Sequence, residues 1–77
     1  MSNGFNSFLN SLDIDPNSSP ENHRLLNREE AFVLAWIAFN PKNRDYRKLI
    51  RDCRLRSLEQ CQEVIQQLID LGLLHTR

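Results

Sequence analysis

The apolar positions of the chain concentrate in nine consecutive residues, 31–39, none of which carries a polar side chain. Three alanines and a leucine in this run favour a helix over a strand. A helix that is apolar on all sides is expected to be buried on all sides, and the run is far shorter than the ~20 residues that span a bilayer. We therefore predict a core helix over about 28–39, with Trp36 largely buried and the rest of the chain, or a second copy, packed around it.

The flanks of this run carry the signals of a helix start and a helix end. Asn27 is a suitable N-cap, and Glu30 three residues later completes the pattern of a capping box. Asn40 precedes Pro41, and a residue before a proline is disfavoured in the α region. The core helix is therefore expected to end at Phe39.

Four apolar residues near the start of the chain follow the spacing of one helix face: Phe5, Phe8, Leu9 and Leu12. The Asn and Ser residues between them are mediocre helix formers, so this helix needs a surface to lie on, and the open apolar side of the core helix is the expected one. A disordered tail is the alternative. Residues 13–22 combine Asp, Asn, Ser and Pro, which predicts an acidic linker. We expect 1–22 to be an amphipathic segment with a linker, and 23–77 to be a helical domain.

Two further amphipathic helices follow the core helix. The first is predicted over 44–54 with Asn43 as its N-cap, and its inner face consists of Tyr46, Leu49, Ile50 and Cys53. Ser57 is expected to cap the second, with Gln60 completing another capping box. The inner face of that helix consists of Leu58, Cys61, Val64, Ile65, Leu68 and Ile69. Gly72 is suited to the left-handed conformation that stops a helix.

Residues 44–74 resemble the helix-turn-helix half of winged-helix transcription regulators, with 31–39 in the place of that family's first helix. The matching features are the run 46–50, Leu55 in the turn, Ser57 at the next helix start, and the ending 68–74 around its glycine. The resemblance implies a small all-α domain with a winged-helix-like three-helix core that binds DNA. The sequence departs from the family at Arg54, where a glycine is common, and after Gly72, where five residues allow one strand but no hairpin wing.

The charge of the chain is zero overall, with ten basic and ten acidic residues, but it is unevenly placed. Residues 42–56 contain seven basic side chains against two acidic ones, a net charge of plus five. The third helix is predicted to expose Glu59, Glu63 and Asp70 without any Lys or Arg. Those carboxylates repel phosphate, although the basic segment just before them can cross a DNA backbone.

Two functions therefore stay open. The first is a small dimeric transcriptional regulator that binds duplex DNA. Its contacts would come from the basic residues Arg44, Arg47, Lys48, Arg51, Arg54 and Arg56, with Gln62, Gln66 and Gln67 near base edges. The second is a protein-interaction module or adaptor that keeps the winged-helix-like core and binds an acidic protein instead of DNA. The basic segment favours the first function, whereas the missing wing and the acidic third helix favour the second.

No pattern of catalytic chemistry is present, whether a Ser-His-Asp arrangement, a glycine-rich phosphate loop or a carboxylate pair. Cys53 and Cys61 are expected to be reduced core thiols, and their spacing lacks the close ligand pairs of a zinc site. The sequence thus predicts a non-enzymatic protein without metal, cofactor or small-molecule substrate. The first residues lack a signal peptide's basic and apolar regions, which predicts a cytoplasmic protein without a membrane partner.

Assembly is predicted from the end of the chain. Leu73 and Leu74 have no obvious cover within the chain, and part of the run 31–39 shares this property. An exposed apolar patch usually marks an interface, and a twofold dimer is the commonest closed assembly. We therefore expect a homodimer.

Overall fold

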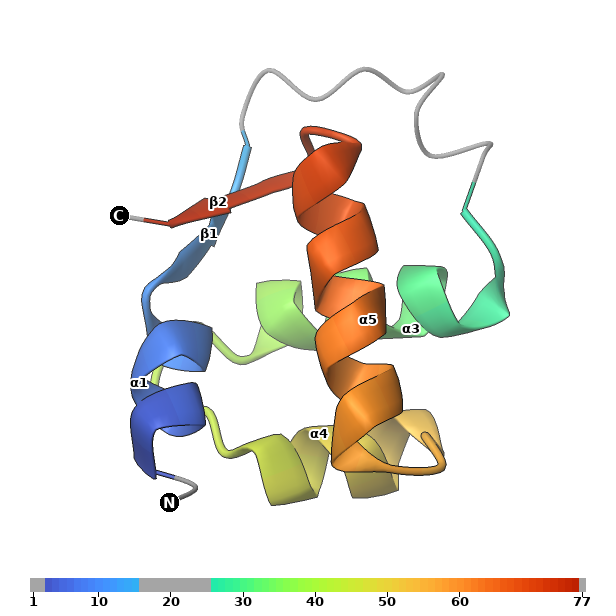
Figure 1. Cartoon of the computed structure of the whole chain (residues 1–77). Helices are drawn as coiled ribbons and strands as arrows, with labels where there is room; N and C mark the ends of the chain where they lie inside the picture. The colour runs from blue at the N-terminus through green and yellow to red at the C-terminus, as the bar shows by residue number, and fades with distance from the viewer. Residues whose placement is uncertain (1–2, 16–25, 77) are drawn as a thin grey trace.

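The computed structural model describes residues 3–15 and 26–76 (Figure 1). This part of the chain forms a small, mostly helical domain with a two-stranded sheet. Its elements are α1 (Asn3–Asn10), β1 (Leu12–Ile14), α3 (Arg28–Phe39), α4 (Tyr46–Cys53), α5 (Leu58–Asp70) and β2 (Leu74–Thr76). The expectation of a small helical domain is confirmed, and the structure adds a short two-stranded sheet that the sequence did not predict.

Helix α3 begins and ends where its flanking residues predict. The Asn27 side-chain oxygen accepts a hydrogen bond from the Glu30 backbone N–H at 2.8 Å, and the Glu30 carboxylate accepts one from the Asn27 N–H at 3.0 Å. Both arms of the capping box are therefore present. The last helical residue is Phe39, directly before the Asn40-Pro41 pair.

The expected burial of α3 on all sides is wrong. Helices α4 and α5 and strand β1 contact this helix, and they cover the side that carries Val33, Leu34 and Ile37. The opposite side stays open, so Phe32 is 50% exposed and Phe39 is 84% exposed. An apolar sequence can therefore leave one face of a helix uncovered when too few elements are available to surround it.

Helix α1 packs against α4 instead of lying over the open side of α3. The Phe5 ring meets the Tyr46 ring edge-on at a centroid distance of 6.0 Å, and the Asn6 side-chain oxygen accepts a hydrogen bond from the Tyr46 N–H at 2.9 Å. Leu9 is fully buried in the common core. The alternative of a disordered tail is therefore wrong for 3–15, although the predicted position on α3 is wrong as well.

The sheet joins the segment that follows α1 to the C-terminal end of the described chain (Figure 1). Strands β1 and β2 are antiparallel, and Ile14 lies opposite Leu74. Asp13 and Ile14 thus belong to a strand and not to the predicted linker, and the Asp15 N–H donates a hydrogen bond to the Leu73 carbonyl at 2.9 Å. Residues 16–22 of the predicted linker lie outside the described part. Leu73 and Leu74 are 0% and 2% exposed. The expectation that they form an uncovered patch is wrong, because the N-terminal strand covers them.

Arg44 lies inside the fold, which corrects its assignment to an outward helix face. Its guanidinium donates hydrogen bonds to four backbone carbonyl oxygens: Leu9 (2.9 Å), Leu12 (2.7 Å), Ile37 (3.1 Å) and Asn40 (2.5 Å). Its backbone also exchanges two hydrogen bonds of 2.8 Å with the Asn10 side chain. Arg44 therefore ties α1 and β1 to the end of α3, because a guanidinium can satisfy several carbonyls at once.

Helix α4 begins two residues later than predicted, at Tyr46. Asp45 is its N-cap and accepts a hydrogen bond from the Arg47 N–H at 2.9 Å. The predicted cap, Asn43, has φ of 58° and belongs to the preceding loop. A left-handed residue turns the chain there, and Asn tolerates this conformation better than most residues.

The connection from α4 to α5 uses a left-handed residue without a glycine. Arg54 has φ of 55° and ψ of 44°, and the Leu55 N–H closes the turn on the Ile50 carbonyl at 2.9 Å. Ser57 caps α5 as predicted, with its hydroxyl accepting from the Gln60 N–H at 3.2 Å. The second capping box is incomplete, because the Gln60 side chain bonds the backbone N–H of residue 56, not that of the cap.

Candidate functional site

The open side of α3 carries a stripe of apolar side chains that we call the α3 stripe. Its members are Ala31, Phe32, Ala35, Ala38 and Phe39, all of which are exposed. At 3.6 residues per turn these positions span about 120° of the helix circumference, centred on Ala35. No polar side chain interrupts the stripe, and Arg28 lies one turn before its first member.

A groove runs along one side of the α3 stripe. It is lined by Ile14, Leu26, Ala31, Leu34, Ala35, Ala38 and Phe39. Every one of these residues is apolar, and they come from α3, from β1 and from the residue that follows the undescribed segment. We call this feature the apolar groove. It offers hydrophobic contact without a charged or hydrogen-bonding side chain in its lining.

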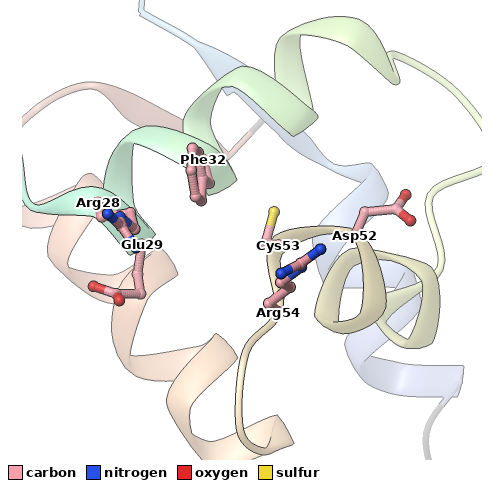
Figure 2. Close-up of a pocket in the computed structure, with 6 residues that line it drawn as sticks. All are labelled: Arg28, Glu29, Phe32, Asp52, Cys53 and Arg54. Atoms are coloured by element: carbon pink, nitrogen blue, oxygen red, sulfur yellow. The ribbon is translucent and has the colours of Figure 1, made fainter.

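A second hollow lies on the other side of the stripe, between α3 and the end of α4 (Figure 2). Its lining consists of Arg28, Glu29, Phe32, Asp52, Cys53 and Arg54. Figure 2 shows the Cys53 sulfur directed toward the space between the two helices, to the right of the Phe32 ring. Two arginines and two carboxylates give this lining no net charge, so it favours neither an anion nor a cation.

Trp36 lies next to Asp52 and is partly buried against the core, which agrees with the expectation that most of its surface is covered. Its ring packs against the core while its indole N–H donates a hydrogen bond to the Asp52 carboxylate at 2.9 Å. This hydrogen bond lowers the pKa of Asp52, and the nearby Arg51 lowers it further. The indole thus lies at the edge of the core because its polar nitrogen has a partner there.

The basic side chains form a second exposed surface, which we call the basic surface. Its members are Lys42, Arg47, Lys48, Arg51, Arg54 and Arg56, all exposed. Arg47 pairs with Asp45 at 3.1 Å and Arg51 with Asp52 at 3.3 Å, yet about three quarters of each arginine side chain stays exposed. The Arg47 hydrogen bond lowers the pKa of Asp45. Exposed ion pairs of this kind are weak, so both arginines stay accessible to other anions.

The outward face of α5 has a different character. Gln62, Gln66 and Gln67 are exposed as predicted, beside the exposed carboxylates of Glu59, Glu63 and Asp70. The Gln66 amide donates a hydrogen bond to the Asp70 carboxylate at 3.0 Å. Of the nine side chains predicted to contact DNA, the structure therefore places five on the basic surface, three on this acidic face and one, Arg44, in the interior.

The two thiols are free and buried, as expected for core cysteines. Burial raises the pKa of Cys53 to about 11 and that of Cys61 to about 12. Both side chains are therefore thiols and not thiolates at neutral pH. Within 3–15 and 26–76, no cluster of three His, Cys, Asp or Glu side chains is arranged to hold a metal ion.

Sequence reasoning expected part of the run 31–39 to lack cover, but it did not identify which of these residues form the open face. The available signal was the alternation of alanines with bulky residues at helical spacing, which separates a small-residue face from a core face.

Among the helices of the described chain, none has the length and apolar character needed to cross a membrane. No protein-family model, curated protein or solved structure matches the chain.

Proposed function

We propose that this chain is a protein-interaction domain whose binding surface is the α3 stripe together with the apolar groove. One observation carries this proposal: Phe32 and Phe39 are half and almost fully exposed on a helix face whose side chains from residue 31 to residue 39 are all apolar. Leaving such a surface in water is unfavourable, and contiguous exposed apolar patches mark interaction sites. Aromatic side chains are also enriched in the buried centres of interfaces.

The character of α5 supports the same proposal. A helix that reads DNA lies against a phosphate backbone, and the outward face of α5 presents Glu59, Glu63 and Asp70 without a cation. Burying Arg44 also removes one positive charge from the surface that was expected to meet phosphate. A winged-helix-like core used for protein contact, and not for DNA, is consistent with both features.

Site-specific photo-crosslinking in the cells that express the protein tests this function. A photoreactive amino acid at position 39 is expected to give covalent adducts with a defined protein, identified by mass spectrometry. The matched control carries the same group at Gln62, an exposed position on the acidic face of α5. Equal adduct patterns at both positions, or none at position 39, would overturn the proposal.

A second candidate is DNA binding, and the basic surface is the observation that favours it. Six exposed cations lie within the fifteen residues 42–56, and cations of this kind bind DNA by neutralising phosphates. In this function α4 and its flanking loops would lie along the DNA backbone, as the first helix of a helix-turn-helix does. The glutamines of α5 would then have to approach base edges despite three neighbouring carboxylates.

A further inference from the structure

The side chains of the α3 stripe are arranged evenly on either side of Ala35, and this arrangement suits pairing with an identical stripe. We propose that it binds the α3 stripe of a second copy of this chain, with the two helices antiparallel about a twofold axis next to Ala35. This inference rests on the proposed protein-interaction function and names the partner of that surface. Its support comes from the positions of five side chains, from the charge at the end of the stripe and from the area available.

The side chains of the stripe divide into two rows. Phe32 and Phe39 are seven residues apart and lie on one side of the stripe, while Ala31 and Ala38 have the same spacing on the other side. Ala35 lies midway between the ends of both rows. An antiparallel twofold axis at Ala35 keeps each row on its own side, so Phe32 meets Phe39 of the second copy and Ala31 meets Ala38 of the second copy.

This pairing buries the bulky side chains and lets the helices approach closely. The phenylalanine rings form two aromatic contacts related by the symmetry, and such pairs add to the benefit of simple burial. The alanine row leaves space for the backbones to come within the ~8–10 Å that separates packed helix axes. The interface is isologous, because each copy contributes the same residues to it.

The charge at the start of the stripe decides the orientation of the two helices. Arg28 lies within about 20° of the centre of the stripe and has no ion pair in the described part of the chain. Parallel helices would place the two Arg28 side chains at the same height, where they repel each other. Antiparallel helices place each Arg28 at the C-terminal end of the other α3, where the helix dipole favours a cation.

The area available is small for a specific interface, which indicates a weak and reversible dimer. With ~200 Å² for a whole phenylalanine, the exposed parts of Phe32 and Phe39 contribute about 500 Å² in two copies. The alanines, Leu26 and Arg28 bring the total toward the ~1,000 Å² at which a specific interface becomes plausible. We therefore expect a reversible dimer with a dissociation constant on the order of 10–100 µM.

Disulfide trapping tests the register directly. In Ala35→Cys the two new thiols face each other across the axis, and mild oxidation at about 100 µM protein should shift most of the chain to doubled mass on a non-reducing gel. The control is Ala31→Cys, whose thiols would be separated by about 12 Å along the helices and should stay unlinked. The buried native thiols do not compete, because their pKa values are raised to about 11 and about 12.

Sedimentation completes the test. The wild-type chain should approach twice its 9.1 kDa mass at high protein concentration, and Phe39→Glu should return it to the monomer. At a low concentration, where both proteins are monomers, their melting temperatures should be equal. Gln62→Glu, on α5, is the matched control and should still dimerise. Cross-linking of both cysteine variants would overturn the antiparallel orientation, and cross-linking of neither would overturn the dimer.

Failure of the dimer and failure of the protein-interaction function are distinguishable. If the wild-type chain is a monomer at about 0.5 mM while the photoreactive group at position 39 gives adducts with a different protein, the surface binds that protein and the second-copy inference is wrong. If position 39 gives no adduct and the chain is a monomer, both proposals are wrong. Adducts of the chain with itself at position 39 support both.

Discussion

At the scale of single residues, Arg44 shows that the type of a side chain does not determine its role. It belongs to a strongly basic stretch, and five neighbouring Lys and Arg side chains of that stretch are exposed on α4 and the loop after it. Arg44 differs because it lies in the loop between α3 and α4, where backbone carbonyl groups of three elements converge on its guanidinium. A buried carbonyl without a partner is costly, so a multi-donor side chain stabilises this point more than an apolar one.

The role of Arg44 is tested by Arg44→Met, which keeps a long unbranched side chain but removes the hydrogen-bond donors. We expect a loss of about 3–5 kcal/mol in the free energy of unfolding, because several buried carbonyls lose their partner. Urea denaturation followed by circular dichroism measures this loss. Arg51→Met, at an exposed position in the same stretch, should change stability by no more than about 0.5 kcal/mol. Equal effects of the two substitutions would contradict the structural role of Arg44.

At the scale of elements, α3, α4 and α5 each begin at a capping interaction within a few residues of the helix end. The capping box at Asn27 begins α3, the Asp45 side chain begins α4, and Ser57 begins α5. Gly72, with φ of 78°, follows the end of α5. The connection from α4 to α5 lacks such a glycine, and Arg54 adopts the left-handed conformation instead. A residue with a Cβ atom is strained in this conformation, so a glycine at this position should increase the free energy of unfolding.

Replacing Arg54 with glycine should relieve that strain. The left-handed conformation costs a residue with a Cβ atom about 1–2 kcal/mol, and part of this gain is offset by the greater freedom of glycine in the unfolded chain. We expect Arg54→Gly to raise the free energy of unfolding by about 0.5–1 kcal/mol, measured by thermal denaturation. Arg47→Gly, inside α4, should instead lower it by about 1 kcal/mol. A destabilised Arg54→Gly protein would show that the arginine side chain has a stabilising contact in solution.

At the scale of the whole molecule, charge and apolar surface are separated. The basic surface covers α4 and its flanking loops, the carboxylates lie along the outside of α5, and the α3 stripe is apolar. Each face therefore suits a different kind of contact: anions at α4, cations at α5 and hydrophobic partners at α3. This separation allows the two candidate functions to be tested independently on one protein.

The DNA candidate predicts a strong dependence of affinity on salt. If the basic surface contacts phosphates, binding to random duplex DNA should weaken by a log–log slope of about 0.9 for each phosphate neutralised. Replacing Arg47 and Arg51 with alanine should flatten this slope by about 2 and weaken all sequences alike, whereas Gln66→Ala should alter the preference among sequences. A gel-shift titration at about 50 mM salt measures both effects. Absence of a shift at about 10 µM protein would remove DNA binding from consideration, because non-specific binders gain greatly in affinity at low salt.

What the sequence by itself determined is the local structure. A cap and the backbone groups that it satisfies lie within three residues of each other, so Asn27, Ser57 and Gly72 could be assigned without any knowledge of the rest of the fold. The inner face of α5 could also be predicted, because the helical spacing of its apolar residues is a local property of the sequence. The resemblance to winged-helix regulators directed attention to the basic segment, and it stays untested.

What only the tertiary structure decided is which surfaces meet. Strand pairing between β1 and β2 joins residues about sixty positions apart, and the short apolar pattern around Leu12 fits a helix as well as a strand. Whether Phe39 is covered depends on how many elements pack around α3, and the sequence of α3 does not determine that number. The candidate interaction surface therefore emerged from the fold, because burial is a property of the neighbours of a residue and not of the residue itself.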